Sequence, residues 1–221
     1  MRGVDVRRAG RWVLRDLTVQ LRGDRRYALV GENGAGKTQF LKLLATEIWP
    51  TPTGRECLRY RVDGRLLEPR EVKRRIAALG AERQDRYTRY GWNPRVRDLL
   101  ATGLHGTDLL LTAPAAEELR RVERIAREAG IRRLLDRTLL SLSYGQRRIA
   151  LLARALIGAP DWLLLDEIYD GLDTDFRRRA DRLLAAARER GQAWVAAAHR
   201  SADVPRGTTE LLRLRAGRLV F

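Results

Sequence analysis

The chain has 221 residues, of which 44% are hydrophobic, so it is long enough for one large domain with a full core. Its 44 Lys and Arg residues against 28 Asp and Glu residues give a formal net charge of +16. The arginines are spread along the chain rather than gathered in one block, so we interpret this charge as a feature of composition and expect no nucleic-acid partner. The one cysteine, Cys57, excludes a disulfide framework and a cysteine-ligated metal cluster.

The N-terminal segment MRGVDVRRAGRW is basic and has no apolar segment after it, so we expect no secretory signal peptide. No apolar run approaches the roughly 20 residues that a membrane-spanning helix needs. We therefore expect a cytoplasmic chain, with peripheral attachment to the cytoplasmic face of the cell membrane as an alternative.

The first third of the chain alternates short strands with one helix. The alternating segment LTVQL (17–21) predicts a half-buried strand. The apolar run YALV (27–30) predicts a buried parallel strand, and apolar residues at helical spacing predict a helix over 37–49. From 56 to 67 the pattern is again that of strands, with a turn at Asp63–Gly64.

The middle of the chain, residues 85–140, is first polar and aromatic and then helical. Its segment 115–131 predicts a strongly amphipathic helix closed by Gly130. We interpret 85–140 as a helical subdomain inserted into a domain that spans 1–221. The last third predicts, in order, a helix over 143–160, a strand over 161–167, a helix over 175–191, a strand over 193–199 and a hairpin over 210–221.

The segment GENGAGKT (31–38) matches the spacing G-x-x-x-x-G-K-[ST] of a phosphate-binding loop. Its glycines allow backbone N–H groups to surround phosphate oxygens, and the helix that follows points its positive end at the same oxygens. Lys37 would reach the β- and γ-phosphates of a nucleotide, and the Thr38 hydroxyl would bind Mg²⁺. The candidate nucleotide-binding residues are Gly31, Glu32, Asn33, Gly34, Ala35, Gly36, Lys37, Thr38 and Gln39.

Together, the loop and the alternating pattern predict an α/β fold with a P-loop NTPase core. Its sheet would be mostly parallel, with an antiparallel β part near the N-terminus and the helical subdomain as an insert.

Two adjacent carboxylates, Asp166 and Glu167, follow the apolar run WLLL. Carboxylates at the end of a buried strand are costly unless they bind a cation or activate a water molecule. Asp166 fits a Mg²⁺ ligand, and Glu167 fits a general base that polarises an attacking water. Solvated acids at an ordinary strand end are the alternative, which a phosphate loop in the same chain disfavours.

The segment LSYGQRR (142–148) lies just before the acidic strand, at the start of a predicted helix. Ser143 is a suitable N-cap, and Gly145 would let the backbone approach an anion closely. Taken by itself, this segment predicts only a capped helix.

In combination, these motifs resemble the nucleotide-binding subunit of ATP-binding cassette (ABC) proteins over nearly the whole chain. GENGAGKT resembles the Walker A loop, LSYGQ the signature, WLLLDE Walker B, DGLD the D-loop and AAAHR the end of the switch-histidine strand, in the order of the family. The resemblance implies an ATPase that uses ATP and Mg²⁺. It also implies a homodimer or heterodimer of cassettes paired head to tail, with ATP between the loop of one and the signature of the other.

The same resemblance implies roles for single residues. The signature residues Ser143, Gly145 and Gln146 would contact the nucleotide bound by the partner cassette. Glu167 would be the catalytic base, and His199 would hold the γ-phosphate and the water in line. Asp173 in the D-loop would communicate across the dimer.

Three positions depart from the family pattern. Tyr144 stands where the signature usually has its first glycine, Ile168 replaces the usual proline after the acidic pair, and Gln39 replaces the usual second hydroxyl residue. The aromatic residue at 144 and the run around it resemble the molybdate-associated twin-cassette (ModF-type) proteins. Because Gly145 is retained, we expect activity to survive.

Two roles stay open at this point. Counting back from LRDLTV without gaps places Arg8 where the family stacks an aromatic residue on adenine, and Trp12 is the nearest aromatic residue. The glutamine of the Q-loop would fall on Ala81, and a short insertion would bring Gln84 into its place. That loop contacts the membrane partner in transporters, so its divergence bears on coupling more than on ATP binding.

The resemblance implies partners that are not part of this chain. We favour a cassette that powers a membrane transporter whose transmembrane permease subunits are separate proteins. The alternative is a soluble ModF-like ATPase without a membrane partner. A nucleic-acid-associated ATP clamp is disfavoured, because the chain has neither a coiled-coil insertion nor a second cassette.

Overall fold

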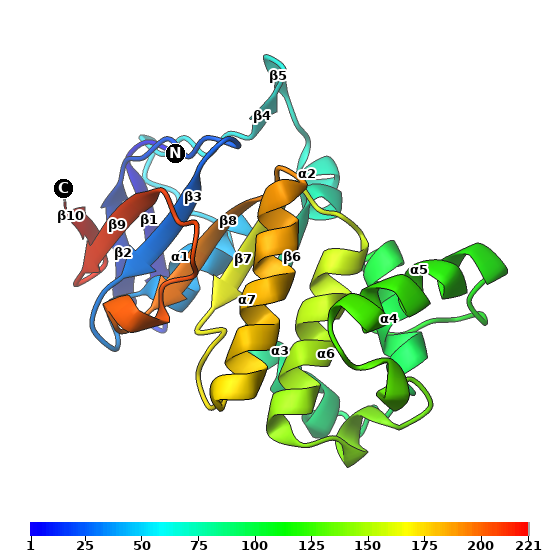
Figure 1. Cartoon of the computed structure of the whole chain (residues 1–221). Helices are drawn as coiled ribbons and strands as arrows, with labels where there is room; N and C mark the ends of the chain where they lie inside the picture. The colour runs from blue at the N-terminus through cyan, green and yellow to red at the C-terminus, as the bar shows by residue number, and fades with distance from the viewer. Residues whose placement is uncertain (221) are drawn as a thin grey trace. The chain divides into compact units, whose positions relative to one another are not determined.

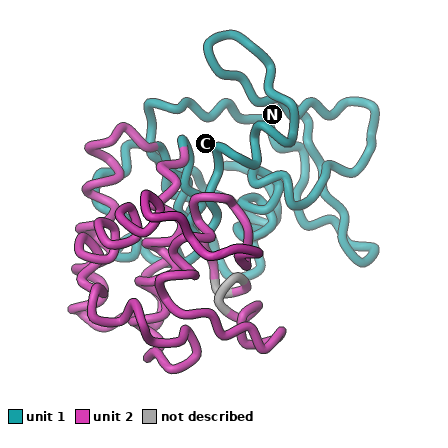
Figure 2. Tube along the Cα trace, turned by 90° about the vertical axis from the view of Figure 1, so that its right-hand side faces the viewer, with its two compact units in different colours: residues 1–78, 161–167, 193–221 teal, residues 79–160, 168–192 magenta. Residues whose placement is uncertain are grey.

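A computed structural model of the protein describes residues 1–220, except for the side chains of Ala81, Arg83 and Gln84. The chain forms two compact units (Figure 2). The first comprises residues 1–78, 161–167 and 193–221, and the second comprises residues 79–160 and 168–192. The second unit includes the whole segment 85–140, although the division of the chain into one domain with an insert over these residues stays a prediction.

A six-stranded sheet has the strand order β10-β9-β3-β8-β7-β6 (Figure 1). Strand β3 pairs in parallel with β8 and β9, and β7 pairs in parallel with β8, whereas β9 and β10 form an antiparallel hairpin. The predicted α/β fold with a mostly parallel sheet is therefore confirmed. The strands are β3 (Arg26–Val30), β6 (Ile76–Leu79), β7 (Trp162–Asp166), β8 (Ala193–Ala198), β9 (Glu210–Arg215) and β10 (Arg218–Val220).

Near the N-terminus, β1 (Val4–Arg8) and β2 (Arg11–Leu17) form an antiparallel pair. The strand predicted over 17–21 is wrong: the β1–β2 pairing ends at Val4 and Leu17, and Met1 and Val19 exchange backbone hydrogen bonds of 2.8 and 3.0 Å beyond it without extending either strand. Val19 and Leu21 alternate for another reason, since both are half-buried against the core of the first unit. Alternating burial of a loop therefore produced the pattern of a strand.

Helix α1 (Lys37–Leu44) packs on β7 and β8 and buries Phe40 and Leu43 in the same core. It ends earlier than position 49, where the prediction placed its end. Thr46 adopts a left-handed backbone with φ of 56°, which an α-helix cannot continue through.

The short strands β4 (Arg61–Val62) and β5 (Arg65–Leu66) join at Asp63–Gly64, which confirms the predicted turn. Both turn residues have a positive φ, as a tight hairpin requires. The Tyr60 hydroxyl just before β4 donates hydrogen bonds to the Leu43 and Leu44 carbonyls, at 3.2 and 2.9 Å. This contact ties the hairpin to the end of α1. Helix α2 (Pro69–Arg75) follows β5 and was not predicted.

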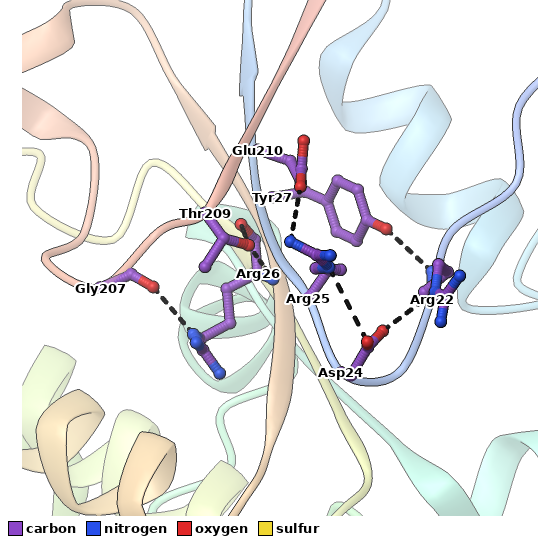
Figure 3. A network of polar contacts seen from close by, with 8 residues as sticks. All are labelled: Arg22, Asp24, Arg25, Arg26, Tyr27, Gly207, Thr209 and Glu210. Carbon is purple, nitrogen blue, oxygen red and sulfur yellow. Dashed lines mark hydrogen bonds and ion pairs between the residues drawn. The ribbon is translucent and has the colours of Figure 1, made fainter.

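A polar network anchors the start of β3 to the start of β9 (Figure 3). The Arg26 backbone N–H donates to Thr209 Oγ1 at 3.0 Å, its Nε donates to the Gly207 carbonyl at 2.8 Å, and Arg25 pairs with Glu210 at 3.2 Å. These bonds position β3, whose other end leads into the phosphate loop. The residues drawn are Arg22, Asp24, Arg25, Arg26, Tyr27, Gly207, Thr209 and Glu210.

The second unit is helical. The predicted amphipathic helix over 115–131 is confirmed by α5, which buries Val122, Ile125 and Ala126 and is followed by Gly130 with φ of 66°. No helix of the described residues is long and apolar enough to cross a membrane. The helices of the second unit are α3 (Ala81–Arg89), α4 (Val96–His105), α5 (Ala116–Glu128), α6 (Tyr144–Ile157) and α7 (Thr174–Glu189), with the short 3₁₀ helices η1 (Arg132–Leu134) and η2 (Leu139–Ser141); η3 (Ser201–Asp203) lies in the first unit.

Candidate functional site

Two positions of the loop between β3 and α1 accept only glycine. A Cβ on Gly31 would lie 2.2 Å from the Leu214 carbonyl oxygen. A Cβ on Gly36 would lie 2.8 Å from the Val13 carbonyl oxygen, and its φ of 104° is in the left-handed region. The loop is therefore pressed against β2 and β9, and Gly36 serves as the N-cap of α1. These contacts give the loop a defined shape at a helix N-terminus.

Lys37 lies under this loop with a side chain that is almost fully buried. Its ammonium donates hydrogen bonds to the carbonyl oxygens of Gly31, at 2.8 Å, and of Glu32, at 3.1 Å. Its Nζ also lies 3.3 Å from His199 Nδ1. The loop thus holds a positive charge close to its own backbone, where a bound anion would be attracted.

The Thr38 hydroxyl donates a hydrogen bond of 2.7 Å to Asp166 Oδ2. Asp166 is the last residue of β7, and Thr38 lies in the first turn of α1, so the packing of this helix on the sheet brings the two side chains together. A hydroxyl that donates its proton keeps lone pairs on its oxygen. The neighbouring oxygens of Thr38 and Asp166 fit a Mg²⁺ ion, which prefers oxygen ligands and takes its remaining ligands from water and phosphate.

Glu167 follows β7 with a left-handed backbone, at φ of 52°. Such a conformation costs a non-glycine residue about 1–2 kcal/mol, so the surrounding structure must hold it in place. The Glu167 N–H donates to the Ala197 carbonyl of β8 at 3.2 Å, and its carboxylate pairs with His199 Nε2. Lys37, His199 and Glu167 therefore form one continuous chain of polar contacts.

A cavity of about 410 Å³ opens at this place. The Gln39 side-chain oxygen is buried and has no hydrogen-bond partner among the described residues, which leaves it available to a ligand. Val13 was not predicted; it comes from β2, far from the motifs in sequence. The cavity is lined by Val13, Asn33, Gly34, Gly36, Lys37, Thr38, Gln39, Glu167 and His199, all of the first unit.

The cavity thus brings together the two predicted catalytic side chains and most of the predicted loop residues. Gly31, Glu32 and Ala35 shape the loop without lining the cavity. Asp166 reaches it through Thr38.

The predicted signature residues lie in the second unit, at the N-terminus of α6. Ser143 is the N-cap, since its Oγ accepts from Gln146 N–H at 3.3 Å, and Gln146 Oε1 accepts from Ser143 N–H at 3.1 Å. This reciprocal pair is a capping box. Gly145 is buried, and a Cβ there would lie 2.4 Å from the Phe176 ring of α7.

The candidates for stacking on adenine lie in the β1–β2 pair. Trp12 is 40% exposed, and the Arg7 guanidinium lies over its ring at 5.5 Å, a contact the sequence reasoning missed. Arg8 pairs with Arg11 in the same hairpin. Neither Arg8 nor Trp12 lines the cavity, although Trp12 precedes Val13, which does. The Gln84 side chain lies outside the described residues, so the assignment of a Q-loop glutamine stays a prediction.

Comparison with known proteins identifies the family. The family model described as ABC transporter matches residues 14–169, more than half of the chain. The uncharacterized ABC transporter ATP-binding protein YmeB of Lactococcus lactis is 26% identical over 222 residues, covering 100% of this chain and 84% of the relative. The ABC transporter ATP-binding protein ModF of Escherichia coli is 30% identical over 182 residues, covering 81% of this chain and 34% of the relative.

A solved structure has the same fold. CbiO1 of Clostridium perfringens, part of the ABC transporter complex CbiONQ, superposes with a TM-score of 0.78 at 20% identity, covering 100% of this chain and 85% of that one. The phosphate loop, the acidic end of β7 and the matched family model all point to the same family. The chain belongs to the ABC transporter family, as an ATP-binding cassette ATPase.

Proposed function

We propose that this cassette hydrolyses ATP in the cavity of the first unit and powers a membrane transporter whose transmembrane subunits are separate proteins. The observation that carries the catalytic part is that one cavity collects Lys37, Thr38, Glu167 and His199. These four side chains would, in this order, neutralise phosphate charge, bind the metal, accept a proton and orient the phosphate.

Lys37 would neutralise the β- and γ-phosphates. Its ammonium is already held by the Gly31 and Glu32 carbonyls, at 2.8 and 3.1 Å, so the charge is in place before the nucleotide arrives. An electrostatic group fixed in advance needs little reorganisation during the reaction.

Thr38 and Asp166 would hold Mg²⁺. When bound, this ion neutralises charge on the phosphate oxygens. The hydrogen bond between the two side chains orients the Thr38 oxygen, and the carboxylate supplies negative charge. Among the described residues no group of three or more His, Cys, Asp or Glu could hold a metal ion alone, which fits an ion completed by phosphate and water.

Glu167 would act as the general base. The oxygen of the attacking water would form a bond to the γ-phosphorus, and the bond between the γ-phosphorus and the β–γ bridging oxygen would break, so that ADP leaves. The Glu167 carboxylate would accept the proton of the water. His199 contacts the Glu167 carboxylate and lies near Lys37 Nζ, so it can orient the base and touch the γ-phosphate.

A second copy, or a related cassette, would complete the site. Ser143 and Gln146 cap the N-terminus of α6, and Gly145 lies in its first turn. A helix N-terminus attracts anions, which supports a contact of this segment with the γ-phosphate bound by the partner cassette.

The proposal of a membrane partner is supported by one protein of the same fold. CbiO1, whose structure has the same fold, is part of a transporter complex. A second candidate function, a cassette ATPase without a membrane partner, is favoured by the ModF likeness and by Tyr144 in the signature.

Crosslinking in the cells that make the protein, followed by separation of membranes from cytosol, distinguishes the two functions. Recovery in the membrane fraction, crosslinked to a multispanning protein, is the expected result. Recovery in the cytosol as a self-crosslinked dimer would overturn the transporter assignment in favour of the second candidate.

A further inference from the structure

Two aromatic rings interlock α6 with the segment that leads into α7. The ring of Tyr144, the first residue of α6, covers Gly171, because a Cβ there would lie 2.7 Å from Tyr144 Cε1. The ring of Phe176, in the first turn of α7, covers Gly145 in the same way, at 2.4 Å from its Cδ2. Each segment thus contributes one aromatic ring and one glycine to the other.

The turn 168–173 between β7 and α7 has further side-chain anchors within the second unit. The buried Arg148 of α6 donates from Nε to the Ile168 carbonyl at 3.3 Å. The Tyr169 hydroxyl pairs with Asp181, and the Arg177 guanidinium lies over the Tyr169 ring at 4.4 Å. These contacts hold the first two residues of the turn, and the Tyr144 ring covers its middle at Gly171.

Gly171 is the residue where the turn depends on this cover. Its φ of 68° is left-handed, and glycine there leaves the backbone with the greatest freedom to change conformation. The Tyr144 side chain is 44% exposed, so burial in the hydrophobic core does not account for the position of its ring. Its contact with Gly171 limits the freedom of the turn and joins the turn to the N-terminus of α6.

We propose that Tyr144 is a positioning residue for ATP hydrolysis, whose ring holds the signature (Ser143–Gln146) and the turn 168–173 as one rigid body. This inference rests on the proposed function, in which the signature contacts the nucleotide of a second cassette, and on the expected role of Asp173 in communication across the dimer. Donors that must meet the γ-phosphate across a dimer lose effectiveness when they are misplaced by as little as about 1 Å.

Steady-state ATP hydrolysis by the full-length chain tests this role with three variants. Tyr144→Ala and Tyr144→Gly should lower kcat about tenfold, while the KM for ATP stays within about twofold, because the Lys37 cavity is untouched. Tyr144→Phe keeps the ring and should keep the parent kcat. The matched control is Tyr90→Ala, which removes another exposed tyrosine of the same unit, one that stacks on Trp92.

Hydrogen exchange in the nucleotide-free protein reports on the contact itself. The Leu172 N–H donates to Tyr169 O at 3.2 Å and the Phe176 N–H to Asp173 Oδ1 at 2.9 Å. Both amides should exchange several-fold faster in Tyr144→Ala and at the parent rate in Tyr144→Phe.

The two measurements separate the possible failures. Faster exchange with unchanged kcat in Tyr144→Ala would overturn the positioning role. Unchanged exchange in this variant would show that the contact of Tyr144 with Gly171 does not restrain the turn. A loss of kcat in Tyr144→Phe equal to that in Tyr144→Ala would assign the effect to the hydroxyl and contradict the proposal. A parent protein without ATPase activity would overturn the proposed function, while exchange would still report on the interlock.

Discussion

The Thr38 hydroxyl donates a 2.7 Å hydrogen bond to Asp166 Oδ2, and this bond joins the phosphate loop to the acidic end of β7. The two residues are far apart in sequence and meet because α1 packs on the sheet beside β7. The pair accounts for two of the oxygen ligands proposed for Mg²⁺.

Thr38→Val removes the hydroxyl but keeps a side chain of similar shape. We expect the affinity for ATP with Mg²⁺ to fall roughly tenfold, while the affinity for ATP in EDTA changes by less than about twofold. Isothermal titration with and without Mg²⁺ measures both. Thr38→Ser, which keeps the hydroxyl, should bind like the parent protein, and an equal loss in EDTA for Thr38→Val would remove the metal-binding role.

Lys37→Ala removes the cation that the loop holds. We expect ATP affinity to fall at least about 100-fold, or roughly 3 kcal/mol, because the phosphates lose a buried charge-assisted partner. The same titration measures this loss, with Lys73→Ala, which removes an exposed lysine of α2, as the charge-matched control. Unchanged affinity in Lys37→Ala would count against the loop assignment.

Gly31→Ala tests the close approach of the loop to β9. A Cβ would lie 2.2 Å from the Leu214 carbonyl oxygen, so backbone must move, and we expect a loss of about 2–4 kcal/mol and a fall in Tm of about 5–15 °C. Gly34→Ala is the control, since a Cβ there meets nothing within 4 Å and only the φ of 79° is strained. Its loss should be about 1 kcal/mol. Equal Tm values in the two variants would refute the clash.

Tyr60 makes stability depend on alkaline pH. Burial raises the pKa of its hydroxyl, so the folded protein keeps the proton at a pH where the unfolded chain loses it. Its contribution is fully present below the ordinary pKa of about 10 and is lost as pH rises above that value. The free energy of unfolding, from urea titrations across this range, should therefore fall less steeply for Tyr60→Phe than for the parent. Parallel curves would show that Tyr60 does not carry this dependence, and Tyr90→Phe, at an exposed position, serves as the control.

The parts of the site that sequence reasoning could predict are local. The loop 31–38 and the acidic end of β7 each need only neighbouring residues and one secondary-structure transition, and both lie where the spacing placed them. The N-cap at Ser143 is local in the same sense.

The parts that the sequence did not predict depend on packing between distant segments. Val13 lines the cavity because β2 lies against the loop, which no motif records. Helix α3 was not predicted, because its segment has few apolar residues and buries Tyr87. The contact of Tyr144 with Gly171 depends on the packing of α6 on α7. In the sequence, Tyr144 is therefore visible only as a departure from the usual signature.

Glu167→Gln is the most direct test of the account, because it removes the proposed base and leaves the cavity and its charge at Lys37 in place. The measurement is single-turnover hydrolysis of ATP with Mg²⁺, followed by size-exclusion chromatography of the same sample. We expect hydrolysis to fall at least about 100-fold and the variant to elute as an ATP-dependent dimer. Hydrolysis at the parent rate, or a variant that stays monomeric with ATP bound, would contradict the assignment of Glu167 and of the paired site.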